Sequence, residues 1–229
     1  MLAANASSYN SHMSIVSQPA VTPPVALVPP ALDLPPVRLA EPTRKRWTRE
    51  EYYRLAEQGW FQNQRVELID GEIIQLSPPS PQHAFSSDEI RDLLQQIFGD
   101  GYWVRMQLPL SYGDHSEPEP DVSVVRGTRK DFQNNHPYTA ALVVEVSRTS
   151  LDYDKKIKPQ LYAEMKIPEY WVLDLVHRQL IVHRQPVSDQ RSGGYRYDSV
   201  TICNEKESVA SLEKPDRPLS VGQMLPRVN

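Results

Sequence analysis

The chain has 229 residues, 39% hydrophobic and 24% charged, which is enough to bury a sizeable core in one large domain or two small ones. Its net charge of −4 argues against a protein that coats nucleic acid, because such proteins are basic, but allows an enzyme with a local DNA-binding patch. The single cysteine, Cys203, excludes an intramolecular disulfide and a cysteine-based zinc site, and no apolar run reaches the roughly 20 residues that span a bilayer.

Residues 1–43 are predicted to form a disordered, proline-rich tail. Prolines fall at positions 19, 23, 24, 29, 30, 35, 36 and 42, and each removes a backbone donor and fixes φ. Docking of a partner on this extended segment is the alternative. Because the N-terminus lacks a basic region followed by an apolar core, we expect no secretory signal and a cytoplasmic protein.

The folded part is predicted to begin with a helix and a hairpin. Thr48 and Glu51 form a capping box ahead of the helical stretch EEYYRLAEQG, and Gly59 stands where the helix should end. Further along, Asp70-Gly71 separates two alternating apolar runs in RVELIDGEIIQLS. This dipeptide between alternating runs is a strong signal for a tight β-hairpin.

The remaining elements alternate between helices and strands. Apolar residues at helical spacing predict a helix over 81–98 that ends at Gly99. A further helix is expected at 159–166, and strands at 102–112, 121–125, 140–147, 169–175, 179–185 and 193–203. This order predicts one mixed α/β (α+β) domain at 44–186, with a central mixed sheet flanked by helices, and residues 187–229 as a strand and C-terminal appendage of the same domain.

Three side chains could carry chemistry. Asp121 opens a strand after Pro120, Glu145 interrupts the apolar strand at 140–147, and Lys158 follows a short loop later, at a helix start. If the strands at 121–125 and 140–147 are neighbours, the two carboxylates converge, and oxygen ligands of this kind suit a hard divalent ion. The ordinary alternative is that Glu145 pairs with a buried lysine or arginine and that Asp121 caps a turn.

A long stretch of the chain resembles a known family. PDVSVV, followed by VVEVSRTSLDYDKKIKPQLYAEMKIPEYWVLDL, is similar to the Uma-type family of restriction endonucleases, within the PD-(D/E)XK nuclease superfamily. The resemblance covers roughly residues 45–185, including VELIDGEII and His83. It implies a restriction-endonuclease-like core and a Mg²⁺-dependent enzyme, with Mn²⁺ as a substitute, that hydrolyses DNA phosphodiester bonds by metal-activated water.

The resemblance also implies roles for single residues. Asp121 and Glu145 would be the metal ligands, and Lys158 would be the catalytic lysine, displaced from the superfamily position two residues after Glu145, where this chain has Ser147. Lys155 and Lys156 are the alternatives to Lys158. Four accessory residues are expected near the site, with Asp154 as a residue behind the ligands or as a helix cap: Glu67, His83, Glu119 and Asp154.

Two other classes of function remain open. A non-catalytic nuclease-like module, binding nucleic acid or a protein, would explain the acidic pI of about 5.9 and the absence of a lysine at position 147. A metal-free hydrolase using paired carboxylates would need a substrate pocket, for which the sequence gives no indication. As partners we expect DNA and a second copy of the chain, and no membrane.

Overall fold

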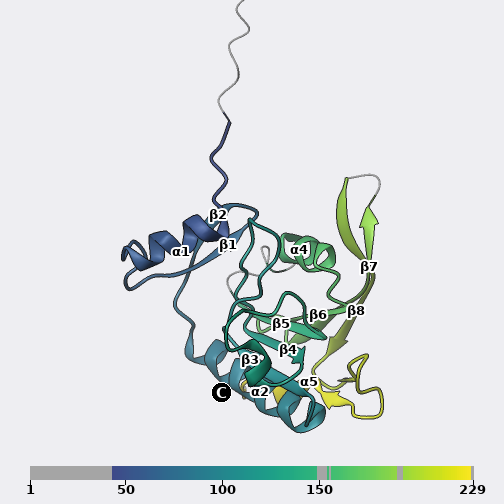
Figure 1. Ribbon diagram of the computed structural model, residues 1–229. Coiled ribbons are helices and arrows are strands. Elements are labelled where there is room, and N and C mark those ends of the chain that lie inside the picture. The colour runs from purple at the N-terminus through teal and green to yellow at the C-terminus, as the bar shows by residue number, and fades with distance from the viewer. Residues whose placement is uncertain (1–42, 149–153, 155, 190–192, 228–229) are drawn as a thin grey trace, which may run out of the picture. The chain divides into compact units, whose positions relative to one another are not determined.

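The computed structural model describes residues 43–148, 154, 156–189 and 193–227 (Figure 1). Arg44–Asn229 forms one compact unit and is described by itself. The predicted disorder of residues 1–43 falls almost entirely outside the described residues. Within the described ranges, no helix combines the length and the apolar character that crossing a membrane requires.

A six-stranded mixed sheet forms the centre of the unit. Its strands, in the order β3-β4-β5-β6-β7-β8, are β3 (Tyr102–Met106), β4 (Val122–Arg126), β5 (Leu142–Ser147), β6 (Glu169–Asp174), β7 (Gln179–Asp189) and β8 (Gly194–Asn204). Strands β5 and β6 run parallel and all other neighbours are antiparallel. A parallel pair needs a crossover, which here contains helix α4 (Lys158–Glu164). The predicted mixed sheet flanked by helices is confirmed.

Helices cover the two faces of the sheet. Helix α2 (Pro81–Phe98) and helix α4 lie on opposite sides of it in Figure 1. Because side chains alternate along a strand, Val144 and Val146 of β5 pack in the core under α2, whereas Val143 packs in the core under α4. Glu145 therefore points to the α4 side, so the sheet delivers one carboxylate into an otherwise apolar layer.

A helix and a hairpin form a smaller layer beside the sheet. Helix α1 (Arg49–Glu57) has the predicted capping box, and strands β1 (Arg65–Ile69) and β2 (Glu72–Leu76) form the predicted hairpin. At its turn, Asp70 and Gly71 have φ of 48° and 79°, the left-handed conformation that a type I′ turn requires. Tyr52 of α1 packs on Val66 and Leu68 of β1 in a small core of their own.

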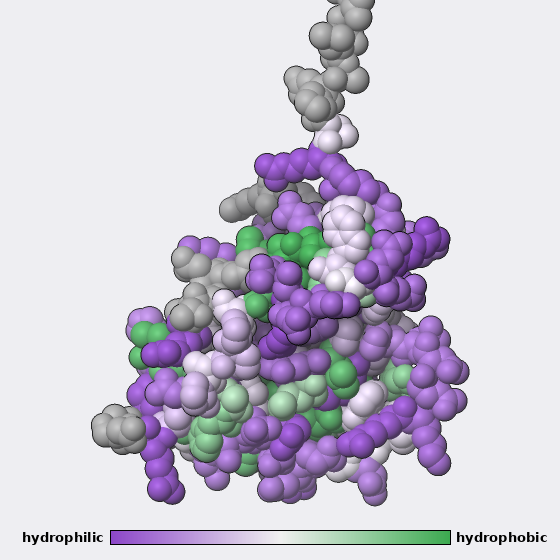
Figure 2. Space-filling model, turned by 90° about the vertical axis from the view of Figure 1, so that its left-hand side faces the viewer, coloured by the Kyte–Doolittle hydropathy of each residue, from purple (hydrophilic) through white to green (hydrophobic). Residues whose placement is uncertain are grey.

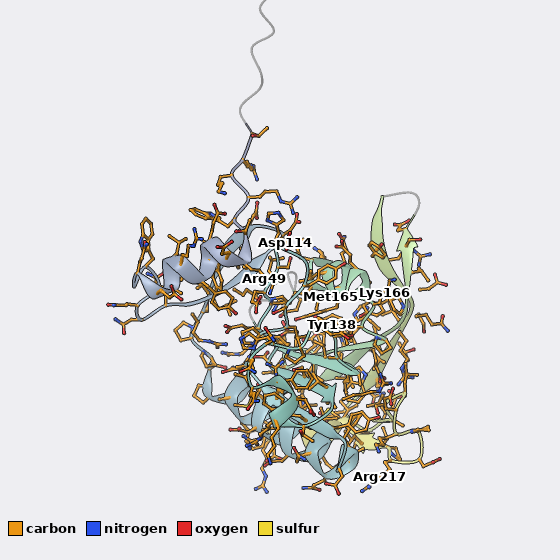
Figure 3. All side chains as sticks on the ribbon, in the orientation of Figure 1. Arg49, Asp114, Tyr138, Met165, Lys166 and Arg217 are labelled. Carbon is orange, nitrogen blue, oxygen red and sulfur yellow. The ribbon has the colours of Figure 1, made fainter. Side chains whose placement is uncertain are left out.

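This layer is bonded to the segment between β3 and β4. The Glu117 amide donates to the Leu68 carbonyl, and the Gly71 amide donates to the His115 carbonyl, both at 2.7 Å. Figure 3 shows Arg49 beside Asp114, and the Arg49 amide donates to the Asp114 carbonyl at 2.7 Å. The hairpin is thus held next to the chain that leads into β4.

One predicted strand is too long. The strand expected at 102–112 ends at Met106, because Gln107 has φ of 50° and turns the chain, and Pro109 has no amide to donate. Beyond it, the chain forms a turn that is closed by an isolated bridge between Tyr112 and Ser116. The apolar side chains of this stretch still matter, since Leu110 is fully buried in the core on the α4 side.

The C-terminal segment packs on the α2 side of the sheet. It contains β9 (Ser208–Val209), β10 (Leu219–Ser220) and α5 (Val221–Met224), and a 3-10 helix, η1 (Arg129–Phe132), follows β4 earlier in the chain. Buried Glu169 anchors the segment by accepting from the Leu212 amide at 2.8 Å and from Arg184 Nε at 2.8 Å. The face turned to the viewer in Figure 2 is largely hydrophilic, with small hydrophobic patches between charged side chains.

Candidate active site

Asp121 and Glu145 meet where β4 begins. Val122 lies opposite Val144 in the antiparallel pair β4–β5, so the preceding and following residues also face each other. The Asp121 amide donates to Glu145 Oε2 at 3.2 Å, and the Val146 amide donates to Asp121 Oδ2 at 2.9 Å. Each carboxylate is thus oriented by the backbone of the other strand, and the convergence expected from the sequence is present.

Helix α4 brings a lysine and a tyrosine to the same carboxylate. Lys158 and Tyr162 are four residues apart and therefore share a helix face. Lys158 Nζ donates to Glu145 Oε1 at 2.8 Å, and the Tyr162 hydroxyl donates to the same oxygen at 2.8 Å. Both side chains are buried. The lysine predicted to face back toward the sheet does so, and Tyr162 is an additional member of the site.

Glu67 adds a third buried carboxylate from the hairpin. Its Oε1 lies 3.4 Å from Lys158 Nζ, a contact between opposite charges, and its Oε2 accepts from the Glu119 amide at 3.1 Å. The side chain is fully buried. Lys158 consequently lies between two carboxylates, Glu145 from the sheet and Glu67 from the hairpin.

His83 lies on the other side of Asp121. It lies in the first turn of helix α2, whose N-cap is Ser80. The Ser80 hydroxyl accepts from the His83 amide at 3.2 Å. Its Nε2 is 3.0 Å from Asp121 Oδ2, while its Nδ1 is buried and has no hydrogen-bond partner in the described part of the chain. A contact of 3.4 Å joins Gln107 Nε2 to Asp121 Oδ1.

A cleft of about 570 Å³ lies at these groups, between the hairpin, α2, β5 and α4. Its lining includes the predicted residues His83, Glu119, Asp121, Glu145, Asp154 and Lys158, together with Arg65, Arg148 and the segment 74–80. The site is therefore reachable from solvent, although Asp121 and Glu145 side chains are only 11% and 4% exposed. Among the accessory candidates, only Glu67 is absent from this lining, because it lies behind Lys158.

Burial and neighbouring charges shift the pKa values of the site. Burial raises the pKa of Glu145 to about 8, although the Lys158 ammonium beside it acts in the opposite direction. Burial would lower the pKa of Lys158, but Glu145 and Glu67 hold it well above its usual range. Burial likewise opposes the ionised form of Asp121, but His83, the Val146 amide and Lys158 together outweigh it, so the pKa of Asp121 is lowered. Lys158 is therefore a fixed positive charge, held between acids.

Two accessory residues lie in the cleft wall. The Glu119 side chain is 23% exposed, and burial raises its pKa. Asp154 does not cap helix α4, whose N-cap is Ile157 with no side-chain cap. Instead, Asp154 is buried in the cleft wall, and its carbonyl accepts from the Tyr170 hydroxyl at 2.8 Å. Lys156 is exposed, and Lys155 lies outside the described residues.

The acids suit a hard divalent cation. Asp121 Oδ1, with its 3.4 Å contact to Gln107, is the least engaged carboxylate oxygen of the pair, and Glu145 Oε2 faces the same backbone corner. Oxygen ligands of this type are those that Mg²⁺ and Mn²⁺ prefer. No group of three or more His, Cys, Asp or Glu residues is arranged to hold an ion in the described ranges. Two carboxylates with several waters is a usual coordination for Mg²⁺.

Sequence comparison identifies the family. The model of the Uma2 family, whose description is "Putative restriction endonuclease", matches residues 49–215. The chain belongs to this family. The match spans the sheet, α1, α2, α4 and every residue of the cleft. No curated protein sequence matches this Uma2 chain significantly.

A solved structure has the same fold. The crystal structure of a "putative nuclease belonging to DUF820" from Anabaena variabilis ATCC 29413 superposes with a TM-score of 0.59. The two sequences are 18% identical, and the alignment covers 77% of this chain and 96% of that chain. At 18% identity, the similarity to this structure shows a shared fold and assigns no residue roles in the Uma2 protein.

Proposed function

We propose that this Uma2 protein is a Mg²⁺-dependent endonuclease that hydrolyses DNA phosphodiester bonds with water as the nucleophile. One observation supports it above all others: Asp121, Glu145 and Lys158 converge from two strands and a helix in one solvent-reached cleft. Two acids and a lysine in this arrangement are those of a PD-(D/E)XK nuclease, with the lysine displaced onto α4. Mn²⁺ is the expected substitute.

In this proposal the two acids hold the metal. Asp121 Oδ1 and Glu145 Oε2 would be the atoms that hold it, and the Val146 amide and His83 Nε2 keep the Asp121 carboxylate oriented from its other oxygen. When bound, the metal supplies a water of lowered pKa and a positive charge opposite the phosphate. The protein supplies orientation, because both carboxylates are fixed before substrate arrives.

Lys158 acts as a charge stabiliser in this proposal. A general base must be able to lose its proton, and the carboxylates of Glu145 and Glu67 keep Lys158 protonated. Its ammonium is thus available to stabilise the negative charge that develops on the phosphate oxygens. The base that deprotonates the attacking water is then solvent or a substrate phosphate.

A non-catalytic module is the second candidate. Glu145 Oε1 already accepts from Lys158 and Tyr162, and its Oε2 accepts from the Asp121 amide. An acid with both oxygens engaged by the protein can be a structural ion pair, and Ser147 occupies the position where the superfamily lysine normally stands. Such a module would bind nucleic acid or a protein without cutting.

Calorimetry with Mg²⁺ and Mn²⁺ separates the two candidates. The nuclease proposal expects binding to the wild-type protein that disappears in Asp121→Asn and in Glu145→Gln. Asp131→Asn is the matched control, because that carboxylate lies in η1 and caps its own turn through the Thr128 amide. Metal binding that survives both site substitutions, or no metal binding at all, contradicts the proposal and favours the module.

The remaining expectations about the protein's setting belong to the same proposal. The family description supports DNA as the substrate we propose, and a homodimer would place two such clefts in one assembly. The single, partly buried Cys203 suits the reducing cytoplasm. Size-exclusion chromatography with light scattering tests the homodimer independently of the chemistry.

A further inference from the structure

The reactive groups lie at the bottom of the cleft, below its rim. The side chains of Asp121, Glu145 and Lys158 are 11%, 4% and 5% exposed. A scissile phosphate must therefore descend between the cleft walls to reach them. The cleft volume of about 570 Å³ falls within the ~300–1,000 Å³ typical of sites that enclose a small ligand.

One wall of the cleft is formed by β2 and the segment that follows it, residues 74–80. Ile74, Leu76 and the exposed Pro78-Pro79 pair contribute its apolar side chains, and Gln75, Ser77 and Ser80 its polar ones. Unpaired bases and sugars offer apolar faces to such a wall, whereas the bases of a duplex are stacked inside the double helix. Sequence-tolerant binding of single strands relies on contacts of this kind, combined with positive charge along the backbone.

The rim carries the positive charge. Arg65, on β1, and Arg148, directly after β5, line the cleft on two different elements. Arg148 is exposed, and Arg65 is 33% exposed and 4.0 Å from Glu119. Below them the acids Asp121 and Glu145 would repel a phosphate in the absence of metal. Two cations above an acidic floor are placed to hold the phosphates that flank a scissile one.

From this geometry we propose that the cleft accepts a single DNA strand, or the unpaired part of a branched one, and excludes an intact duplex, with Arg65 and Arg148 as phosphate-binding residues. This inference rests on the proposed nuclease function. In a duplex the bases stay paired and stacked inside the double helix, so they cannot contact Ile74, Leu76 or Pro78-Pro79 without strand separation. An unpaired strand can lay its bases on these apolar side chains and place one phosphate at the floor.

The test compares one fluorescent oligonucleotide as a single strand, as a full duplex and as a duplex with an unpaired flap. Binding is measured by anisotropy without divalent metal, and cleavage by single turnover with Mg²⁺. We expect the single strand to bind at least tenfold more tightly than the duplex, and cuts to fall in the unpaired flap. Equal binding of the two forms, or cuts within paired DNA, would overturn the inference.

The arginines are tested against a matched control. Arg65→Ala and Arg148→Ala should each weaken single-strand binding about three- to tenfold and reduce the salt slope by about 0.7, the loss of one phosphate contact. Arg196→Ala, on β8 and paired with Asp198, should change neither. Identical effects in all three variants would overturn the assignment of the two cleft arginines.

Failure of this inference differs from failure of the proposed function. A wild-type protein that binds metal and cuts duplex DNA supports the nuclease and contradicts single-strand selectivity. A protein that prefers the single strand, loses that preference in Arg148→Ala, yet never cuts with metal present, supports the cleft assignment and contradicts the nuclease.

Discussion

Lys158 Nζ lies 2.8 Å from Glu145 Oε1, and neither side chain is more than 5% exposed. A buried carboxylate in a core strand is costly when unpaired, so the ion pair explains how β5 tolerates Glu145. The ordinary alternative, a buried acid paired with a lysine, and the catalytic interpretation thus describe the same contact. The cleft favours the catalytic interpretation over the structural one, because a purely structural ion pair needs no access to solvent.

The turn of the β1–β2 hairpin gives a prediction about crowding. A Cβ on Gly71 would lie 2.7 Å from Arg46 Cβ and 3.0 Å from Arg46 Cα, whereas one on Gly113 would meet nothing within 4 Å. Both glycines have positive φ, so Ala costs about 1–2 kcal/mol of strain at either position. Gly71→Ala should be clearly the more destabilising, and Gly71→Val at least as much, by urea denaturation. Equal midpoints for Gly71→Ala and Gly113→Ala would contradict the crowding.

The hydroxyl of Tyr162 gives a prediction about hydrogen bonds to charge. Tyr162 donates to the Glu145 carboxylate and Tyr197 donates to the Ile167 carbonyl, each at 2.8 Å and each buried. Bonds to ionised groups stabilise by about 1.5–3 kcal/mol and neutral ones by about 1 kcal/mol. At pH 9, above the pKa of about 8 of Glu145, Tyr162→Phe should therefore lower the free energy of unfolding more than Tyr197→Phe does. The reverse order would show that Glu145 is not a charged acceptor in the folded protein.

His183 predicts a loss of stability in acid. It is buried between Tyr170 and Tyr197, and burial lowers its pKa to about 4. The unfolded chain, with a pKa near 6.5, binds a proton that the folded chain rejects, so stability is lost as the pH falls from about 6.5 to 4. The full loss is about 3 kcal/mol. His183→Phe should flatten this part of the stability curve measured by denaturant titration, and an unchanged curve would contradict the assignment.

Substitution of Glu67 should slow DNA cleavage without changing DNA affinity. Glu67→Gln keeps the shape of the side chain but removes one of the two charges beside Lys158. We expect cleavage at saturating DNA to fall about tenfold, since the ammonium is less firmly placed, with DNA affinity unchanged. Glu72→Gln, on the same hairpin but 62% exposed, is the control and should cut normally. If the two variants behave alike, Glu67 does not position Lys158.

Local signals in the sequence predicted much of the fold. The capping box at Thr48 and the Asp70-Gly71 turn depend on neighbours in the chain, and both are present. The strand at 102–112 was predicted too long because Leu110 is buried outside any strand, so its apolar character does not mark pairing. Pro109 is visible in the sequence, but the left-handed φ of Gln107, where the chain turns, is not a property of that residue type.

The candidate site was predicted in part, for a similar reason. The sequence alone identifies Asp121, Glu145 and Lys158 as candidates, because each interrupts a local pattern of apolar or turn residues. Tyr162 looks like an ordinary core residue, and Glu67 was expected near the site only through the family resemblance. The tertiary fold places both within reach of the Glu145–Lys158 pair. Contacts between α4 and the β1–β2 hairpin join residues about 90 positions apart, which no local pattern reveals.

The central claim is that Lys158 stabilises charge at a metal-dependent nuclease site. Its most direct test is single-turnover cleavage of circular DNA, single-stranded and supercoiled, in Mg²⁺. Lys158→Ala leaves two acids without their cation, so Lys158→Arg is measured beside it, and thermal unfolding verifies that both are folded. Lys130→Ala, an exposed residue of η1, is the control.

We predict that wild type and Lys130→Ala cut at the same rate, and that Lys158→Ala and Lys158→Arg cut about a hundredfold more slowly, because neither methyl group nor planar guanidinium replaces a compact ammonium. Metal affinity by calorimetry should stay close to wild type in both, since an ammonium cannot coordinate a cation. Wild-type cleavage by folded Lys158→Ala, or no cleavage of either DNA by wild-type protein with metal bound, would contradict the account.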